Sequence, residues 1–152
     1  MVINELSRVS EVEVTYRPKF KASERPKVST SEQAYRLFLN QWNLDKIQFQ
    51  EEFKIMLLNR RNNVLGIADI SMGGISGTFV DPKVVFTIAL KGNASSIVLC
   101  HNHPSGSLKI SDADIRITKQ LKQAGQLLEL PVYDHLIITD HCYYSFADDG
   151  MM

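Results

Sequence analysis

The chain has few of the features that mark secreted, membrane-bound or strongly basic proteins. Its 152 residues hold only two cysteines, Cys100 and Cys142, which are too few for a disulfide scaffold. No apolar run is long enough to span a bilayer, and the N-terminal residues have no apolar core of the kind found in signal peptides. We therefore expect a protein of the reducing cytoplasm with no membrane partner.

Neither sign of charge is in excess, because 17 lysines and arginines balance 17 acidic residues. That balance argues against a protein whose whole surface is basic for nucleic-acid binding, and leaves room only for a local patch. The length favours one domain with a sizeable core. Residues 1–28 differ from the rest and are interpreted as a basic, polar arm, in which residues 11–16 alternate like an edge strand. Residues 29–152 are expected to form the folded domain.

Helical and strand patterns alternate along residues 29–152. They predict helices that begin near residues 30, 81 and 111, and strands over residues 53–58, 64–71, 95–101, 132–139 and 143–146. This order predicts an α/β domain in which a mixed β-sheet is covered by helices on both faces. On the first strand, Glu51 is expected on the apolar side with Phe53, whereas Glu52 and Lys54 are expected on the solvent side.

The strand that ends in His101-Asn102-His103-Pro104 is the most informative part of the chain. Residues two apart on a strand point to the same face, so His101 and His103 lie together. Asp114 follows eleven residues after His103, and Ser111 stands three residues before it, at a predicted helix start. Two imidazoles and a carboxylate form the open ligand set of a catalytic zinc, which predicts a Zn²⁺ site at His101, His103 and Asp114. Ser111 and Asp114 also fit a simple capping box, and a zinc deaminase is excluded because its His-x-Glu and Pro-Cys-x-x-Cys motifs are absent.

Other polar residues carry weaker signals. A hydrolytic metal site needs a nearby proton-transfer group, and Glu51 is the candidate for it. His135 has two interpretations: a hydrogen-bond partner near the metal or substrate, or a satisfied histidine at the start of a strand. We favour the second, because His135 lies outside the ligand spacing. His141 and Cys142 are adjacent, have no partners nearby in the sequence, and are interpreted as turn or surface residues.

Together these residues resemble a known family signature. Glu51, His101-x-His103-Pro104 and Ser111-x-x-Asp114 are similar to the motif of the JAMM (MPN-plus) metalloproteases, and His101-Asn102-His103-Pro104-Ser105-Gly106 resembles the form found in the RadC-like branch. The segments 134–138 and 144–146 resemble that branch as well, so the likeness spans roughly residues 30–150.

The resemblance implies a cytidine-deaminase-like α/β/α fold and a zinc held by His101, His103 and Asp114, with water as the fourth ligand. It also implies that Glu51 is the general base and acid, and that the Ser111 hydroxyl stabilises the developing oxyanion. Full-length relatives often carry a helix-hairpin-helix module before this domain. The residues before Glu51 do not resemble that module, so we expect the short form.

Three functions compete at this point. The first is a zinc-dependent metallopeptidase or isopeptidase that acts on a peptide or isopeptide substrate. The second is a nucleic-acid-processing or DNA-binding factor associated with DNA repair, supported by Lys19, Lys21, Arg25 and Lys27 in the arm and by the family name. The third is a non-catalytic binding module, against which the intact ligand set argues, because a structural zinc normally has four protein ligands.

Overall fold

The computed structural model describes residues 9–13, 15–74 and 77–152. The elements follow one another in the order η2 (Ala22–Glu24, a 3-10 turn), α1 (Ser31–Asn40), β1 (Glu52–Leu58), β2 (Val64–Met72), α2 (Pro82–Lys91), β3 (Ser96–Asn102), α3 (Asp112–Leu127), β4 (Val132–Ile138) and β5 (Tyr143–Ser145). Among the described residues, no helix combines the length and the apolarity needed to cross a membrane.

The five strands form one mixed sheet in the order β2-β1-β3-β4-β5. β3 and β4 run parallel, and the other neighbouring pairs run antiparallel. β3 therefore lies at the centre of the sheet between β1 and β4. Its His101 is paired with Phe53 on one side and Ile137 on the other.

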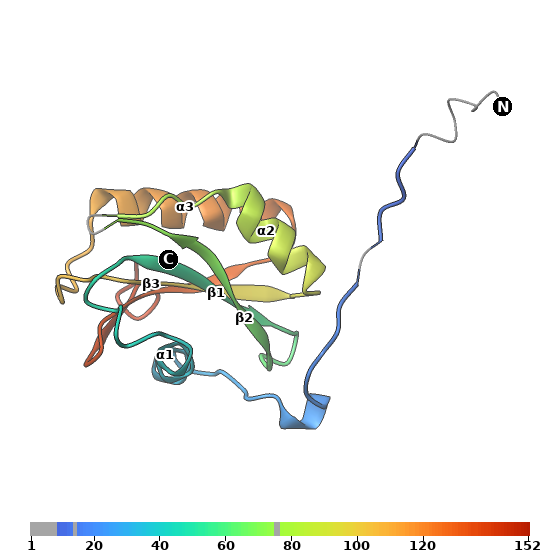
Figure 1. Cartoon of the computed structure of the whole chain (residues 1–152), viewed down its shortest axis with the longest axis horizontal. Helices are drawn as coiled ribbons and strands as arrows, with labels where there is room; N and C mark the ends of the chain where they lie inside the picture. The colour runs from blue at the N-terminus through green and yellow to red at the C-terminus, as the bar shows by residue number, and fades with distance from the viewer. Residues whose placement is uncertain (1–8, 14, 75–76) are drawn as a thin grey trace.

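Helices cover the sheet on both faces, as Figure 1 shows, with α1 on one side and α2 and α3 on the other. The α1 side buries Phe38 and Trp42 against Met56, Val98 and Leu136. The other side packs α2 and α3 on the alternate residues of the same strands, among them Phe53, Ile55, Leu57, Ile97 and Leu99. The expected α/β architecture with helices on both faces is confirmed.

Each main helix begins at the capping signal that the sequence carries. The Thr30 side chain accepts a hydrogen bond from the Gln33 amide at the start of α1, and Asp81 precedes Pro82 at the start of α2. Ser111 caps α3. Strand ends differ from their expected positions by one or two residues, because terminal residues gain or lose a single ladder hydrogen bond.

The expectation that Glu52 and Lys54 face solvent is wrong. Both are 6% exposed, because α1 and the residues after it cover this face of β1. The Lys54 ammonium donates to the Asp69 carboxylate at 2.5 Å, and it lies 3.4 Å from the Glu52 carboxylate and 4.8 Å from the centre of the Trp42 ring. The charge of this buried lysine is thus balanced by two carboxylates and shielded by an aromatic face.

The strand expected over residues 11–16 is also wrong for the residues that the structure describes. Residues 11–13 and 15–16 form no strand, and residue 14 lies outside the described residues. Figure 1 shows this part of the arm running away from the domain, where it has no neighbouring strand to supply hydrogen bonds. Among its described residues, the arm meets the domain near its end, where Lys27 pairs with Asn63.

Candidate metal centre

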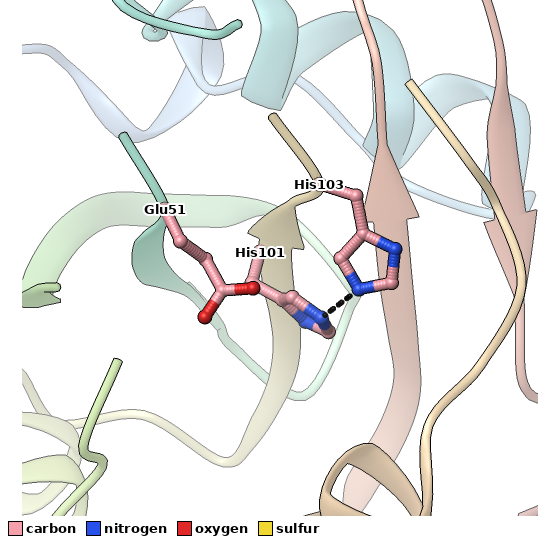
Figure 2. A group of neighbouring side chains, drawn as sticks. All are labelled: Glu51, His101 and His103. Carbon is pink, nitrogen blue, oxygen red and sulfur yellow. Dashed lines mark hydrogen bonds between the residues drawn. The ribbon is translucent and has the colours of Figure 1, made fainter. Parts of the chain in front are cut away.

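The end of β3 presents both histidines on the face covered by α2 and α3. His101 follows Leu99 onto that face, whereas Asn102 points to the α1 side. The His103 amide donates to the carbonyl of Ile138, 3.2 Å away, so the ladder with β4 continues one residue past the strand. The chain therefore stays extended, and the two imidazoles point toward each other, as Figure 2 shows.

The two rings meet through their Nε2 atoms, which lie 3.0 Å apart. The Asp114 carboxylate faces the same point, with Oδ1 3.1 Å from His101 Nε2 and Oδ2 3.5 Å from His103 Nε2. Each imidazole uses its other nitrogen within the protein: Nδ1 of His101 lies 2.8 Å from His135 Nε2, and Nδ1 of His103 lies 2.7 Å from the Ser107 carbonyl. Possible metal-binding atoms of three residues thus face one another, two from the end of β3 and the residue after it and one from the start of α3.

This arrangement fits a metal ion. Ligand atoms about 2.0–2.1 Å from a tetrahedral zinc lie about 3.3 Å from one another. The two Nε2 atoms are 3.0 Å apart, and each has one of the two Asp114 oxygens at 3.1 or 3.5 Å, so the spacing is of that order. A carbonyl can only accept a hydrogen bond, so His103 Nδ1 carries the hydrogen and Nε2 presents a lone pair. That lone pair lies close to a carboxylate and a second imidazole, and a cation shared by the three groups would stabilise it.

Ser111 and Asp114 form a capping box, and the Asp114 carboxylate also lies beside the two imidazoles. The Ser111 hydroxyl accepts from the Asp114 amide at 3.1 Å, and the Asp114 carboxylate accepts from the Ser111 amide at 2.8 Å, which completes a capping box. The carboxylate oxygens face the imidazoles at the same time. Burial raises the pKa of Asp114, but its contacts with His101 and His103 and the Ser111 amide outweigh burial and hold that pKa well below its usual range. Asp114 is therefore ionised, as a metal ligand must be.

The pKa of His103 also depends on its neighbours in this cluster. Burial lowers the pKa of His103, but its hydrogen bonds with Asp114 and Ser107 and the charge of Glu51 outweigh burial, and the pKa is raised. The cluster therefore attracts positive charge in the form of a proton. A metal ion would compete with that proton for the same lone pairs.

Glu51 lies beside the histidines, although it stands one residue before β1. Glu51, His101 and His103 each place one ligand atom within 4.8 Å of the others, and Figure 2 shows the carboxylate pointing to the His101 ring. Burial raises the pKa of Glu51, and the nearby imidazoles only partly oppose that rise. A carboxyl with a raised pKa next to a metal site is suited to receiving and returning a proton.

A cavity of about 580 Å³ opens over this cluster. Glu51, both histidines, Ser111 and Asp114 all line it, so the sequence-predicted site residues share one chamber. Its outer wall comes from residues 77–80 after β2 and from one stripe of α3, including Arg116 and Gln120. The cavity has the size of a small-ligand or peptide-segment site.

Two contributors to the site were missed or undervalued from the sequence. His135 is fully buried and contacts His101, so the structure contains the hydrogen bond that the less favoured interpretation requires. Asn102 is fully buried on the other face, where its side chain holds the segment that leads to Glu51. The position of Asn102 in the sequence could have indicated this role, because an asparagine in a buried central strand must find hydrogen-bond partners. His141 and Cys142 are exposed, as expected.

Comparisons with known proteins agree with this geometry. Residues 28–151 match the family model described as the RadC-like JAB domain. A UPF0758 protein of Flavobacterium johnsoniae is 50% identical over 101 residues, which cover 66% of this chain and 44% of the relative. A UPF0758 protein of Alkaliphilus metalliredigens is 48% identical over 103 residues, covering 68% of this chain and 44% of the relative.

A longer match is found with a UPF0758 protein of Clostridium botulinum, which is 37% identical over 131 residues, covering 86% of this chain and 56% of the relative. The chain thus spans about half the length of the curated relatives it matches. The family match over nearly all of the folded domain, with the donor cluster in place, shows that this chain belongs to the RadC-like JAB domain family.

Proposed function

We propose that this domain is a zinc-dependent metallopeptidase or isopeptidase. The observation that carries this proposal is the convergence of His101, His103 and Asp114 on one point, with the Glu51 carboxyl beside them at the floor of a cavity. Three protein donors leave a position open for chemistry, whereas a purely structural zinc normally uses four. When bound there, a zinc ion supplies a Lewis acid that makes hydrolysis by water feasible near neutral pH.

The residues around the donors then have distinct roles. Glu51 receives the proton of the attacking water and delivers it to the leaving amine, for which its raised pKa suits it. The oxygen of Ser111 accepts from the Asp114 amide, which leaves the hydroxyl hydrogen to donate toward the cavity. That hydrogen bond stabilises negative charge on the carbonyl oxygen of the substrate. His101, His103 and Asp114 hold the metal.

The proposal is tested with three proteins: wild type, Glu51→Gln and His103→Ala. Metal content is measured by elemental mass spectrometry after zinc loading, and hydrolysis is measured by mass spectrometry of new termini in a complex peptide mixture. We expect about one zinc per chain in the wild type and in Glu51→Gln, and none in His103→Ala. Cleavage should fall by about 10²-fold or more in Glu51→Gln.

Each other outcome points to a specific error. A wild type that takes up no zinc contradicts the metallopeptidase. A Glu51→Gln protein that keeps zinc and cleaves at the wild-type rate removes Glu51 as the base. A Glu51→Gln protein that loses zinc makes Glu51 a ligand instead.

A second candidate function, nucleic-acid binding, is favoured by one observation. Residues 17–27 hold five lysines or arginines and one acidic residue in a chain of zero net charge. The end of this segment lies along the β1–β2 hairpin, because the Val64 amide donates to the Pro26 carbonyl at 2.8 Å. It therefore adds to the charge of Arg60 and Arg61 at the hairpin tip, and the exposed Phe20 offers a face on which a base could stack.

This candidate is tested by neutralising charge rather than by deletion, because Val28 is buried in the core. Lys19, Lys21 and Arg25 are changed to glutamine, and binding of a fluorescent single-stranded DNA is measured over a range of salt. If the segment binds nucleic acid, affinity falls and the logarithmic salt slope drops by about 2. An unchanged affinity and slope would remove this function.

A further inference from the structure

His135 lies directly behind His101, on the side away from the converging donors. β4 runs parallel to β3, which brings the two rings to 4.8 Å between centroids. Phe146 stacks on the His135 ring at 4.9 Å, and Phe53 meets it edge-on at 5.6 Å. The ring is fully buried, and both of its nitrogens have a protein partner within hydrogen-bond distance.

Those two nitrogens belong to a chain of hydrogen bonds whose direction can be followed from one end. The Thr118 hydroxyl lies 2.6 Å from the backbone carbonyl of Asp114, which can only accept, so the hydroxyl hydrogen is used there. Thr118 therefore accepts from Nδ1 of His135, 2.5 Å away. Nε2 of His135 is left without a hydrogen and accepts from Nδ1 of His101 at 2.8 Å. The last member, His101 Nε2, then presents a lone pair to Asp114 and His103.

We propose that His135 and Thr118 are positioning residues that hold His101 in its metal-binding tautomer and orientation. Because the chain begins at the Asp114 carbonyl, it also ties one end of the donor set to the other. Neither residue lines the cavity, so neither touches a substrate. Both roles rest on the metal site of the proposed function.

The physical reason is the one that applies to ligating histidines in general. A ring that donates its second N–H to a fixed acceptor loses rotational freedom and keeps its lone pair aimed at the metal, and losing that acceptor weakens metal binding about 10–100-fold. Carboxylates and carbonyls are the usual acceptors. Here an imidazole serves instead: the Thr118 oxygen accepts from its Nδ1–H, which leaves its Nε2 to accept from His101.

The test compares pairs of variants that differ in hydrogen bonding more than in size. His135→Leu removes the acceptor, whereas in His135→Gln the amide oxygen can accept from His101 and the amide nitrogen can donate to Thr118. Thr118→Val removes the hydroxyl and keeps the shape, and Thr118→Ser keeps the hydroxyl. Zinc affinity is measured by competition with a chromogenic chelator, and thermal unfolding of each metal-free protein reports on folding.

We expect zinc affinity about 10–100-fold weaker in His135→Leu and in Thr118→Val, and within about threefold of wild type in His135→Gln and Thr118→Ser. Long-range nitrogen-15 NMR of the metal-free wild type should show His101 protonated at Nδ1, and that preference should be lost in Thr118→Val. If His135→Leu does not fold, the two Thr118 variants decide the question.

Two results are kept apart by this design. If the wild type binds zinc, and Thr118→Val and the His135 variants bind it with the same affinity, the positioning role alone is overturned. A wild type that binds no zinc overturns the metal site itself, and the positioning role with it.

Discussion

Replacing Asn102 with alanine should destabilise the domain and misplace Glu51. The Asn102 side chain accepts from the Glu52 amide at 2.7 Å and donates to the carbonyls of Ile47 and Gln50, at 2.7 and 2.8 Å. Its three bonds therefore hold the backbone on both sides of Glu51. Asn102 is fully buried, so bulk water does not reach the groups that it bonds.

The magnitude follows from the number of bonds. Each contributes about 1 kcal/mol net, so the loss of three lowers the free energy of unfolding by about 3 kcal/mol. For a domain of this size the melting temperature should fall by about 6–12 °C. Glu51 should also lose its alignment, so hydrolysis should fall further than the remaining folded fraction explains, while zinc content is retained.

The matched control is Asn59→Ala. Asn59 likewise accepts two backbone hydrogen bonds, from Arg61 and Asn63, but in a partly exposed hairpin turn. Its loss should cost about 1 kcal/mol or less, because water can reach the freed amides. Urea unfolding followed by circular dichroism measures both variants. If Asn102→Ala is no less stable than Asn59→Ala, the three hydrogen bonds of the Asn102 side chain do not hold the segment before β1.

Three further perturbations test other parts of the structure. Burial raises the pKa of Asp134, so its folded form keeps its proton to higher pH than the unfolded chain does. The stability of the wild type relative to Asp134→Asn should therefore be full below about pH 4 and be lost as pH rises through that raised pKa; equal differences in urea titrations at pH 4 and pH 7 would contradict this. Lys54→Met leaves Glu52 buried without its partner and should lower the free energy of unfolding by about 3 kcal/mol. Adding Glu52→Leu should restore most of that loss, and a double variant as unstable as Lys54→Met would count against the buried pair. Gly125→Ala places a Cβ 2.4 Å from the Leu130 carbonyl oxygen and should lower stability by about 1–3 kcal/mol in thermal unfolding, whereas an unchanged melting temperature would mean that the turn after α3 shifts freely.

Local patterns in the sequence were enough to predict where His101, His103 and Asp114 stand on their strand and helix. Alternation along β3 put His101 and His103 on one face, and the serine and aspartate at the start of α3 marked a capped helix end. Both follow from the periods of strand and helix, which depend only on nearby residues. The resemblance to a family motif indicated that the histidines and the aspartate belong to one site. In the structure their side chains lie next to one another.

Only the tertiary structure decided how the site is supported. Periodicity separates two faces of a strand but does not say what covers each one, so Glu52 and Lys54 were assigned to solvent although α1 buries them. It also does not say which strands are neighbours. The parallel pairing of β3 with β4 puts His135 behind His101, and the return of the chain before β1 puts Ile47 and Gln50 over Asn102. These contacts join residues more than thirty positions apart, and long-range packing selects them, whereas the local sequence preferences of either segment do not.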